Sequence, residues 1–249
     1  MTWKNGTLPR VPAPPSQTIS GTTRPYWTPA EIPGCPFGRL VCSVCAGPPT
    51  ADALESLILD ERRYAEGLES EARSREWIGG RLCLAGAVAL LSAARQAMLP
   101  DAAGAPTVPA GIAASISHKG PLAVALAATT RGGVGIDVEC VGLGDTMLES
   151  KVLTASERMR LDGREPFAAA VFVVAHFALK ESIYKALTPA DQAELEFDDI
   201  ELTLPALMER TWLEVAARLV RRPSTIVRAA LLVDDEWMIA AAERDGSRA

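Results

Sequence analysis

The chain has 249 residues and a mass of 26.4 kDa, enough to bury a substantial core as one large domain or as two lobes of about 110 residues each. Apolar residues make up 48% of the chain and charged residues 22%, a balance that excludes a disordered protein. The formal net charge of −6 argues against a nucleic-acid-binding protein, because phosphate backbones are bound by basic surfaces.

The same sequence gives no sign of a membrane or secreted protein. No uninterrupted apolar run reaches the roughly 20 residues that a membrane span requires, and the first residues, MTWKNGTLPR, lack the apolar segment of a secretory signal. We therefore expect a cytoplasmic protein with thiol cysteines. Cys42 and Cys45 have the spacing of half a zinc site, but a structural zinc site needs four ligands and only Cys35 lies nearby, so two small core residues on a strand are the simpler interpretation.

The first part of the chain divides into an arm and a predominantly helical lobe. Residues 1–37 are rich in Pro, Thr and Gly without helical or strand periodicity, so they predict an N-terminal arm outside the core. Residues 38–118 form the predicted first lobe. It contains a strand at 39–46, helices at 51–67 and 70–98, and a short strand at 113–117, and the pair Gly79-Gly80 allows a kink in the second helix.

Residues 119–249 form the predicted second lobe. It begins with strands at 122–128 and 133–139. The motif TASE at 154–157 has the form of a capping box and predicts a helix start, and Pro166 suits the first turn of a long helix ending near Leu187. Further strands are expected at 200–204, 212–219, 225–233 and 237–242. Strands and a long helix in each half predict an α+β protein of two similar lobes.

The stretch GVGIDVE at 133–139 contains the first candidate functional residues. Residues two apart on a strand project from the same face, so Asp137 and Glu139 present two carboxylates side by side. A hard divalent cation such as Mg²⁺ takes oxygen ligands and would neutralise both. The alternative is a strand that ends in solvent with two hydrated acids.

The late part of the long helix, FALKESIYK at 177–185, adds a third acid and two lysines. Glu181 and Lys185 lie four residues apart and share a helix face, which commonly means a surface ion pair. The helix is otherwise apolar, however, so this face is expected to border the interior or a cleft. Glu181 and the lysines Lys180 and Lys185 then suit a site for Mg²⁺ and phosphate.

Two further groups of residues suit phosphate binding. In SISHKG at 115–120, Ser, His and Lys supply donors at a strand-to-turn junction, although a lone histidine is more often structural. Arg73 and Arg81 lie eight residues apart, just over two helical turns, and are expected to fall roughly on one stripe. The alternative for these arginines is an ordinary charged helix face.

Taken in order, SISHKG, GIDVE and LKESIYK resemble the motifs of the 4′-phosphopantetheinyl transferases, and most closely the two-lobed, monomeric enzymes that activate siderophore, peptide and polyketide synthetases. The resemblance covers about residues 70–187. It implies a pseudo-twofold α+β pair of lobes with the active site in the cleft between them. It also implies transfer of the phosphopantetheine arm of coenzyme A to a serine of an apo acyl or peptidyl carrier domain, with release of 3′,5′-ADP.

The resemblance also implies roles for individual residues. Asp137, Glu139 and Glu181 would hold Mg²⁺ on the diphosphate of coenzyme A, Glu181 would be the base, and Lys185 would stabilise the leaving phosphate. The residues implied to contact the coenzyme are Arg73, Arg81, Ser117, His118, Lys180 and Lys185.

Some positions depart from the family pattern. Phe177 stands where many relatives have Trp, and between Arg95 and Lys119, where relatives often carry a basic residue and a Trp-Pro element, the chain reads PDAAGAPTVPAGIAAS. Either the coenzyme binds more weakly than usual or its contacts come from elsewhere. Two other functions therefore stay open: a protein of the same fold that binds coenzyme A or carrier proteins without turnover, and an unrelated metal-dependent hydrolase using the same acids.

Overall fold

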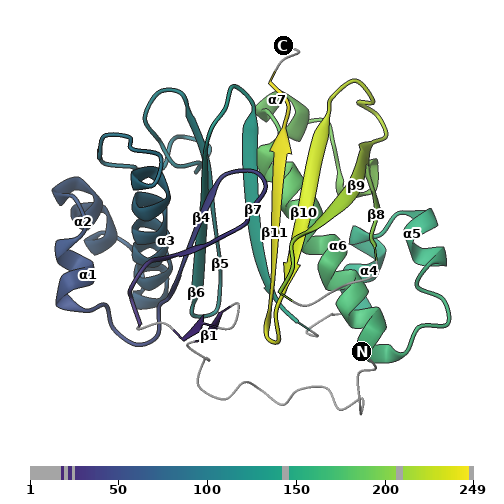
Figure 1. Cartoon of the computed structure of the whole chain (residues 1–249), viewed down its shortest axis with the longest axis horizontal. Coiled ribbons are helices and arrows are strands. Elements are labelled where there is room, and N and C mark those ends of the chain that lie inside the picture. The colour runs from purple at the N-terminus through teal and green to yellow at the C-terminus, as the bar shows by residue number, and fades with distance from the viewer. Residues whose placement is uncertain (1–17, 20–21, 24–25, 142–145, 206–209, 247–249) are drawn as a thin grey trace.

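The computed structural model of the chain describes residues 18–19, 22–23, 26–141, 146–205 and 210–246. Its main body has four layers, in the order helix, sheet, sheet, helix (Figure 1). Each half of the chain contributes one antiparallel sheet and one long helix that covers the outer face of that sheet. The predicted α+β fold with two similar lobes is thus confirmed.

The first lobe is built on a four-stranded sheet covered by helix α3. Apolar side chains of α3 pack against the outward residues Ala123, Ala125 and Ala127 of the sheet. The strands, in sheet order, are β3 (Ala30–Ile32), β4 (Arg39–Val44), β6 (Leu122–Thr129) and β5 (Ile112–Lys119), and the helices are α1 (Ala51–Glu55), α2 (Leu59–Glu66) and α3 (Glu71–Ala89).

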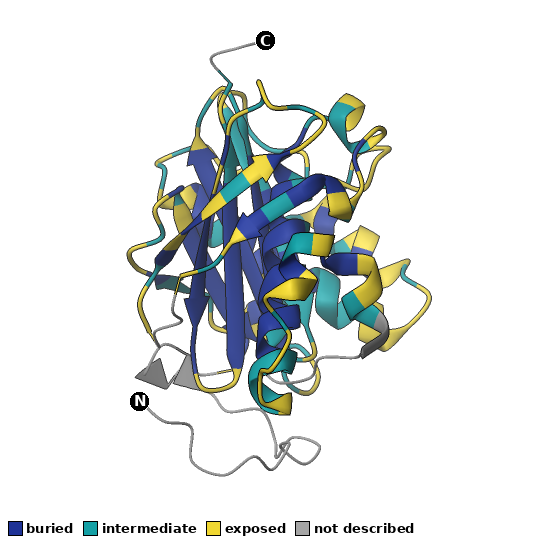
Figure 2. Cartoon of the chain, turned by 90° about the vertical axis from the view of Figure 1, so that its right-hand side faces the viewer, coloured by how far each residue is buried: buried dark blue, intermediate teal, exposed yellow. Residues whose placement is uncertain are grey.

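The second lobe is built on a five-stranded sheet covered by helix α6. Figure 2 shows buried residues running along the central strands of this lobe and along α6. The strands, in sheet order, are β7 (Gly133–Cys140), β11 (Trp237–Arg244), β10 (Val227–Val233), β9 (Leu213–Leu219) and β8 (Ile200–Thr203), and the long helix is α6 (Pro166–Ala186).

Shorter elements complete the described part of the chain. Helices α4 and α5 lie beside α6, and α7 follows it (Figure 1). The bounds are α4 (Thr146–Val152), α5 (Ala155–Met159), α7 (Pro189–Gln192), the 3₁₀ helix η1 (Phe197–Asp199), and the two-residue strands β1 (Thr18–Ile19) and β2 (Thr22–Thr23).

The two sheets face each other across a shared apolar core. Strand β7 shows how the alternation of the sequence produces it: Val134, Ile136 and Val138 point into the space between the sheets. They meet residues of the opposite sheet such as Leu40 and Val124. The other residues of β7 therefore face α6, which puts its two acids on the helix side of the sheet.

Two expectations about the helices of the first lobe were wrong in detail. The helix expected at 51–67 is broken into α1 and α2, and the next helix ends at Ala89 rather than at residue 98. Gly79 and Gly80 do not kink α3; they let it approach the sheet, since a side chain on Gly79 would overlap the Cys45 sulfur. Helix α4 was not predicted at all.

The expected lobe and arm boundaries also differ from the structure. The boundary placed between residues 118 and 119 falls inside β5, and β6 belongs to the first sheet because it pairs with both β4 and β5. Residues 26–37 of the expected arm belong to the first lobe, because β3 pairs with β4 and Phe37 is buried. Residues 1–17 of that arm lie outside the described residues.

Helix α6 is the one described helix long and apolar enough to cross a membrane, by length and composition only. Most of it is buried inside the protein: 61% of its most apolar window is covered by neighbouring elements. This burial is typical of the core helix of a globular lobe, and Glu181 and Lys185 near its end are partly exposed.

Candidate active site

The helix-facing side of β7 carries both glycines and both acids of the GVGIDVE stretch. A side chain at Gly135 would overlap the carbonyl oxygen of Ser182, and one at Gly133 would overlap that of Ala186. The two glycines therefore let α6 lie directly against β7. This close approach brings Asp137 and Glu139, further along the same face, to the turn of α6 that carries Glu181 and Lys185.

Strand β5 approaches the free edge of β7 and satisfies its polar groups. The hydroxyl of Ser115 accepts a hydrogen bond of 3.2 Å from the backbone N–H of Ile136, and the hydroxyl of Ser117 donates one of 2.8 Å to Oδ1 of Asp137. At the end of the same face, Nζ of Lys119 lies 2.7 Å from Oε2 of Glu139. The candidate site thus lies where the edge strands of the two lobes meet.

Lys185 connects the residues of this junction. Its Nζ atom lies 2.7 Å from Oδ1 of Asp137, 3.2 Å from the carbonyl oxygen of Ile136 and 3.5 Å from the hydroxyl oxygen of Ser117. The carboxylate of Glu181 is 3.9 Å from the same ammonium. The predicted pair Glu181–Lys185 is therefore part of an interlobe cluster rather than an isolated surface ion pair.

Burial and mutual repulsion perturb two of the three acids. Partial burial raises the pKa of Glu139, and the nearby carboxylate of Asp137 raises it further, whereas Lys119 lowers it. Burial also raises the pKa of Glu181, which Lys185 lowers and the two strand acids raise. These shifts show that the three carboxylates share one electrostatic environment.

One oxygen of this cluster has no partner among the described residues. Oδ2 of Asp137 is buried and accepts no hydrogen bond, although Oδ1 accepts two. A buried carboxylate oxygen left unpaired is costly, so its natural partner is a cation. Within the described ranges, no three His, Cys, Asp or Glu side chains are grouped closely enough to enclose a metal ion. Instead, the ammonium of Lys185 pairs with Asp137 and that of Lys119 pairs with Glu139.

A second group of charged residues lies beside the end of β5. His118 Nε2 is 3.6 Å from a carboxylate oxygen of Glu76, and the same oxygen is 3.4 Å from the guanidinium of Arg73. Arg75, Glu76 and His118 line a cavity of about 250 Å³ between the start of α3 and the β5–β6 turn. Arg75 was not predicted as a site residue, although it lies in the charged segment EARSREW.

Two residues expected at the site lie elsewhere. Lys180 is fully buried, and its ammonium donates to Oε2 of Glu157 at 2.7 Å and to the carbonyl oxygens of Val152 and Phe197. Because an ammonium has three donors and all three are used, this geometry does not fit a phosphate contact. Its place in the motif gave no signal that the side chain points into the lobe.

Arg81 is likewise buried rather than beside Arg73. Its guanidinium stacks on Trp77, 4.7 Å from the ring centroid, and burial lowers its pKa while Glu61 of α2 counteracts this shift. Eight residues correspond to about 80° beyond two full turns, enough to turn Arg81 towards α2. The two arginines therefore do not form one anion-binding stripe.

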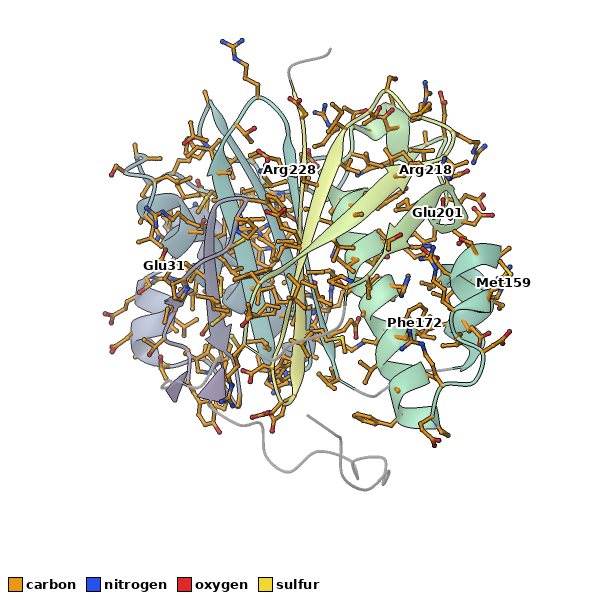
Figure 3. The ribbon with its side chains drawn as sticks, turned by 45° about the vertical axis from the view of Figure 1, so that its right-hand side comes forward. Glu31, Met159, Phe172, Glu201, Arg218 and Arg228 are labelled. Carbon is orange, nitrogen blue, oxygen red and sulfur yellow. The ribbon has the colours of Figure 1, made fainter. Side chains whose placement is uncertain are left out.

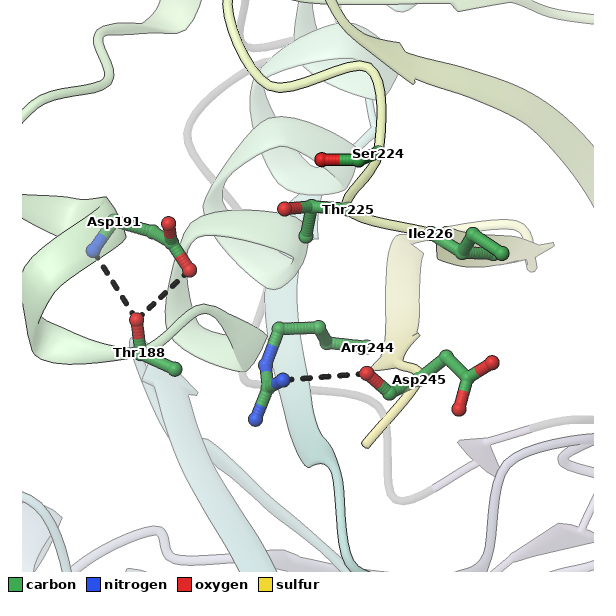
Figure 4. A pocket seen from close by; sticks show the side chains of 7 residues that line it. All are labelled: Thr188, Asp191, Ser224, Thr225, Ile226, Arg244 and Asp245. Atoms are coloured by element: carbon green, nitrogen blue, oxygen red, sulfur yellow. Dashed lines mark hydrogen bonds between the residues drawn. The ribbon is translucent and has the colours of Figure 1, made fainter. Parts of the chain in front are cut away.

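A further cavity of about 240 Å³ lies at the far end of the second lobe (Figure 4). Arg244 lines it and pairs in the sheet with Gly133, six residues before Glu139, so the cavity is remote from the acids. Its lining combines hydroxyls, one arginine and two acids and points to no single ligand. The lining residues are Thr188, Asp191, Ser224, Thr225, Ile226, Arg244 and Asp245.

Comparison with known families agrees with this arrangement. Residues 67–128 match the family model described as the 4′-phosphopantetheinyl transferase N-terminal domain, and residues 133–225 match that of the 4′-phosphopantetheinyl transferase superfamily. Together these matches cover more than half of the chain, one in each lobe. The chain therefore belongs to the 4′-phosphopantetheinyl transferase superfamily, as the motif resemblance indicated.

Individual relatives are similar over part of the chain. The sequence is 35% identical over 155 residues to the 4′-phosphopantetheinyl transferase Svp of Streptomyces mobaraensis, and this match spans 60% of the chain and 62% of the relative. A holo-(acyl-carrier-protein) synthase from Bacillus anthracis str. Ames in complex with CoA (3′,5′-ADP) is 24% identical, with a TM-score of 0.37, over 47% of this chain and 96% of that one. The Thermotoga maritima holo-[acyl-carrier-protein] synthase is 22% identical, with a TM-score of 0.35, over 45% and 62%.

Proposed function

We propose that this protein transfers the 4′-phosphopantetheine arm of coenzyme A to a serine hydroxyl of apo acyl or peptidyl carrier domains and releases 3′,5′-ADP. The observation that carries the proposal is the convergence of Asp137, Glu181 and Lys185 at the junction of the two lobes. Acids and ammonium groups collected at one point suit a reaction in which a diphosphate is bound and cleaved. Family membership supports the same reaction.

The residues at the junction fit a divalent cation, for which we propose Mg²⁺. The unpaired buried oxygen of Asp137 supports this assignment, because a cation would satisfy it, and Glu139 and Glu181 lie close enough to Asp137 to feel its charge. Asp137, Glu139 and Glu181 would be its protein ligands. When bound, such an ion neutralises charge on the diphosphate.

The chain's own side chains would carry out the proton and charge movements. The carrier serine oxygen forms a bond to the β-phosphorus, and the bond from that phosphorus to the bridging oxygen of 3′,5′-ADP breaks. Glu181, whose raised pKa suits a base, takes the proton of the serine hydroxyl. The ammonium of Lys185 stabilises the negative charge that develops on the leaving phosphate.

Further donors near β5 would hold the coenzyme. Ser117 and His118 are at the strand end that faces the site, and Arg73 and Arg75 lie beside His118. We propose that Arg75 supplies part of the basic surface for which the segment between Arg95 and Lys119 has no residue. These donors replace Lys180, whose ammonium is engaged inside the second lobe, and Arg81, whose guanidinium is engaged inside the first lobe.

The partners would be coenzyme A and carrier domains of siderophore, peptide or polyketide synthesis, and neither nucleic acid nor a membrane. We further propose that the protein acts as a monomer in the cytoplasm.

Two competing functions make different predictions. A binding protein without turnover would bind coenzyme A but modify no carrier domain, and a metal-dependent hydrolase would release phosphopantetheine to water.

Intact-protein mass spectrometry of a purified apo carrier domain separates these possibilities. Incubation with this protein, coenzyme A and Mg²⁺ should add about 340 Da, the mass of the phosphopantetheine arm, and a chelator should prevent the addition. Binding of coenzyme A without a mass change on several carriers would favour the binding protein. Free phosphopantetheine in the supernatant would favour the hydrolase.

A further inference from the structure

We propose that Lys119 is a counter-ion of Glu139 and that its ammonium competes with the divalent cation for this carboxylate. When the cation binds, the ammonium of Lys119 moves to a phosphate of the coenzyme. This inference rests on the proposed function, because it concerns the same site. Lys119 follows Ser117 on the same face of β5, yet the motif resemblance gives it no role.

The contact between Lys119 and Glu139 is short, and the lysine side chain is much more exposed to solvent than the glutamate side chain. Nζ of Lys119 lies 2.7 Å from Oε2 of Glu139; the lysine side chain is 44% exposed, whereas that of the glutamate is only 15% exposed. The acid is therefore held in place by its surroundings, and the lysine reaches it from the solvent side. A long, flexible side chain in this position can leave the acid without any change in the strand.

Strand β5 ends at Lys119, directly before the turn to β6. Lys119 is the last residue of β5, and Gly120 has φ of 53° in the turn that leads to β6. The turn borders the cavity lined by His118 and Arg75. A lysine released from Glu139 therefore has other phosphate-binding side chains beside it.

The charge balance of the site gives the exchange its direction. The acids Asp137, Glu139 and Glu181, when ionised, face the ammonium groups of Lys119 and Lys185, which leaves one unit of negative charge. A divalent cation changes this to one unit of positive charge, and an ammonium beside that cation is then repelled. The diphosphate of the coenzyme offers the displaced ammonium a new anionic partner.

The two lysines of the site are not equivalent in this respect. Lys185 donates to the carbonyl oxygen of Ile136 as well as to Asp137, so its position is fixed by the backbone. Lys119, in contrast, contacts the site through its ion pair with the side chain of Glu139. Lys119 is therefore the cation that can be exchanged without disturbing the junction of the lobes.

Two binding measurements that do not require turnover test this proposal. Mn²⁺ is titrated into the protein without coenzyme A and the free ion is counted by electron paramagnetic resonance, and coenzyme A is titrated calorimetrically with Mg²⁺ present. Lys119→Met removes the charge and keeps the length of the side chain. Lys119→Arg keeps the charge, and Arg39→Met removes the cation of the 3.1 Å pair with Glu31.

Arg39 is a suitable control because it lies at the opposite end of the first sheet. On strand β6, Arg39 is aligned with Ala127, whereas Lys119 is aligned with Leu122. The loss of an ion pair there should leave both binding constants unchanged.

For Lys119→Met we expect the Kd of Mn²⁺ to fall about two- to fivefold, as the loss of a partly exposed competing ion pair predicts, and the Kd of coenzyme A to rise by a similar factor. Lys119→Arg should stay close to the wild type in both titrations. An unchanged or weaker affinity for Mn²⁺ in Lys119→Met, or an unchanged affinity for coenzyme A, would overturn the proposal. Because neither titration depends on transfer, failure of the proposed enzymatic function would be seen separately in the carrier mass assay.

Discussion

Most contacts of the candidate site converge on Lys185. Its ammonium joins Asp137 of β7, Ser117 of β5 and Glu181 of its own helix. It therefore serves two purposes in the proposed reaction: it holds the acids at the junction of the lobes, and it supplies positive charge where the leaving phosphate develops its negative charge.

Replacement of Lys185 by Met tests the proposed role of this lysine in catalysis. We expect kcat for carrier modification to fall on the order of 10²-fold, the usual effect of removing one donor from a developing anion. The midpoint of thermal unfolding should fall at the same time, because Asp137, whose side chain is 7% exposed, loses its ammonium partner, so the rate is measured well below that midpoint. The rate of mass addition at saturating coenzyme A measures the effect.

Lys151→Met provides the matched control. This lysine is exposed on α4, outside the junction, so its loss should leave the rate near that of the wild type. An unchanged rate in Lys185→Met would show that the leaving phosphate is stabilised by another group.

At the scale of elements, α6 must be fixed before its acid and lysine can meet β7. The residue next to Glu181, Lys180, ties the helix to the chain before it and after it through Val152, Glu157 and Phe197. Glu157 in turn accepts hydrogen bonds from the backbone N–H groups of Thr154 and Leu202. This buried network connects α5, η1 and β8 to the turn of α6 that bears the site.

Removal of Lys180 should therefore destabilise the second lobe. Lys180→Met leaves the carboxylate of Glu157 buried without its ammonium, which typically costs about 3–5 kcal/mol. Chemical denaturation should show this loss as a lower midpoint. The double variant Lys180→Met, Glu157→Gln removes both charges and should recover part of it, and equal stability of single and double variants would contradict an ion pair.

His176, one turn before Lys180, should make the stability of the lobe depend on pH. Its ring is buried and donates from Nδ1 to the carbonyl oxygen of Phe172, and burial lowers its pKa from 6.5 to about 4. As the pH falls, His176 therefore binds its proton at a higher pH in the unfolded chain than in the folded protein. The stabilisation is complete above pH 6.5 and is lost progressively down to about pH 4.

The free energy of unfolding measured at several pH values tests this dependence. Between about pH 6.5 and 4 the wild type should lose up to about 3 kcal/mol more than His176→Gln, which has no group to titrate. The comparison uses the slope against pH, so an overall loss of stability in the variant does not affect it. Parallel slopes would mean that His176 keeps an ordinary pKa.

The sequence predicted these elements better than it predicted the positions of their side chains. The alternation in GVGIDVE placed Asp137 and Glu139 on one face, and the strands of the second lobe lie close to their expected positions. Whether a lysine or an arginine points into the lobe depends on packing with distant segments. For this reason Lys180 was wrongly expected at the phosphate, and the contact of Lys119 with Glu139 was not predicted, although Lys119 alternates with Ser117.

Boundaries set by long-range contacts were also missed. The side chain of Glu61 accepts a hydrogen bond of 3.0 Å from the backbone N–H of Ile58 at the start of α2 and another from Met98. This buried acid separates α1 from α2 and holds the chain after α3 in a non-helical course. Local helix propensity contains no information about such a contact.

At the scale of the whole molecule, the two lobes share the core between their sheets, and the site lies at the edge where β5 and β7 meet. The face of the second sheet opposite α6 carries exposed ion pairs, such as Arg218 with Glu201 and Arg228 with Glu243; Figure 3 labels Arg218, Glu201 and Arg228. The charges of these pairs are neutralised locally and add little to the long-range field of the protein.

This charge distribution predicts how the rate should respond to salt. A carrier domain is usually an acidic helical bundle, and an enzyme with a net charge of −6 would not attract it over long distances. We expect contact through apolar side chains with local basic rims, and Met159 on α5, 70% exposed, is one apolar side chain available for it. Between roughly 0.05 and 0.2 M salt, kcat/KM for the carrier should change less than about threefold, whereas a steep loss would indicate electrostatic steering.

The central claim is that the acids and lysine at the junction of the lobes form a transfer site for phosphopantetheine. The most direct test compares wild-type protein with Asp137→Asn in the intact-mass assay of an apo carrier domain with coenzyme A and Mg²⁺. Circular dichroism first establishes that both proteins are folded. The account predicts a gain of about 340 Da on the carrier serine with the wild type and a rate at least about 100-fold lower with the variant, because a cation ligand is lost. Equal rates for the two proteins would contradict it and move the site away from Asp137.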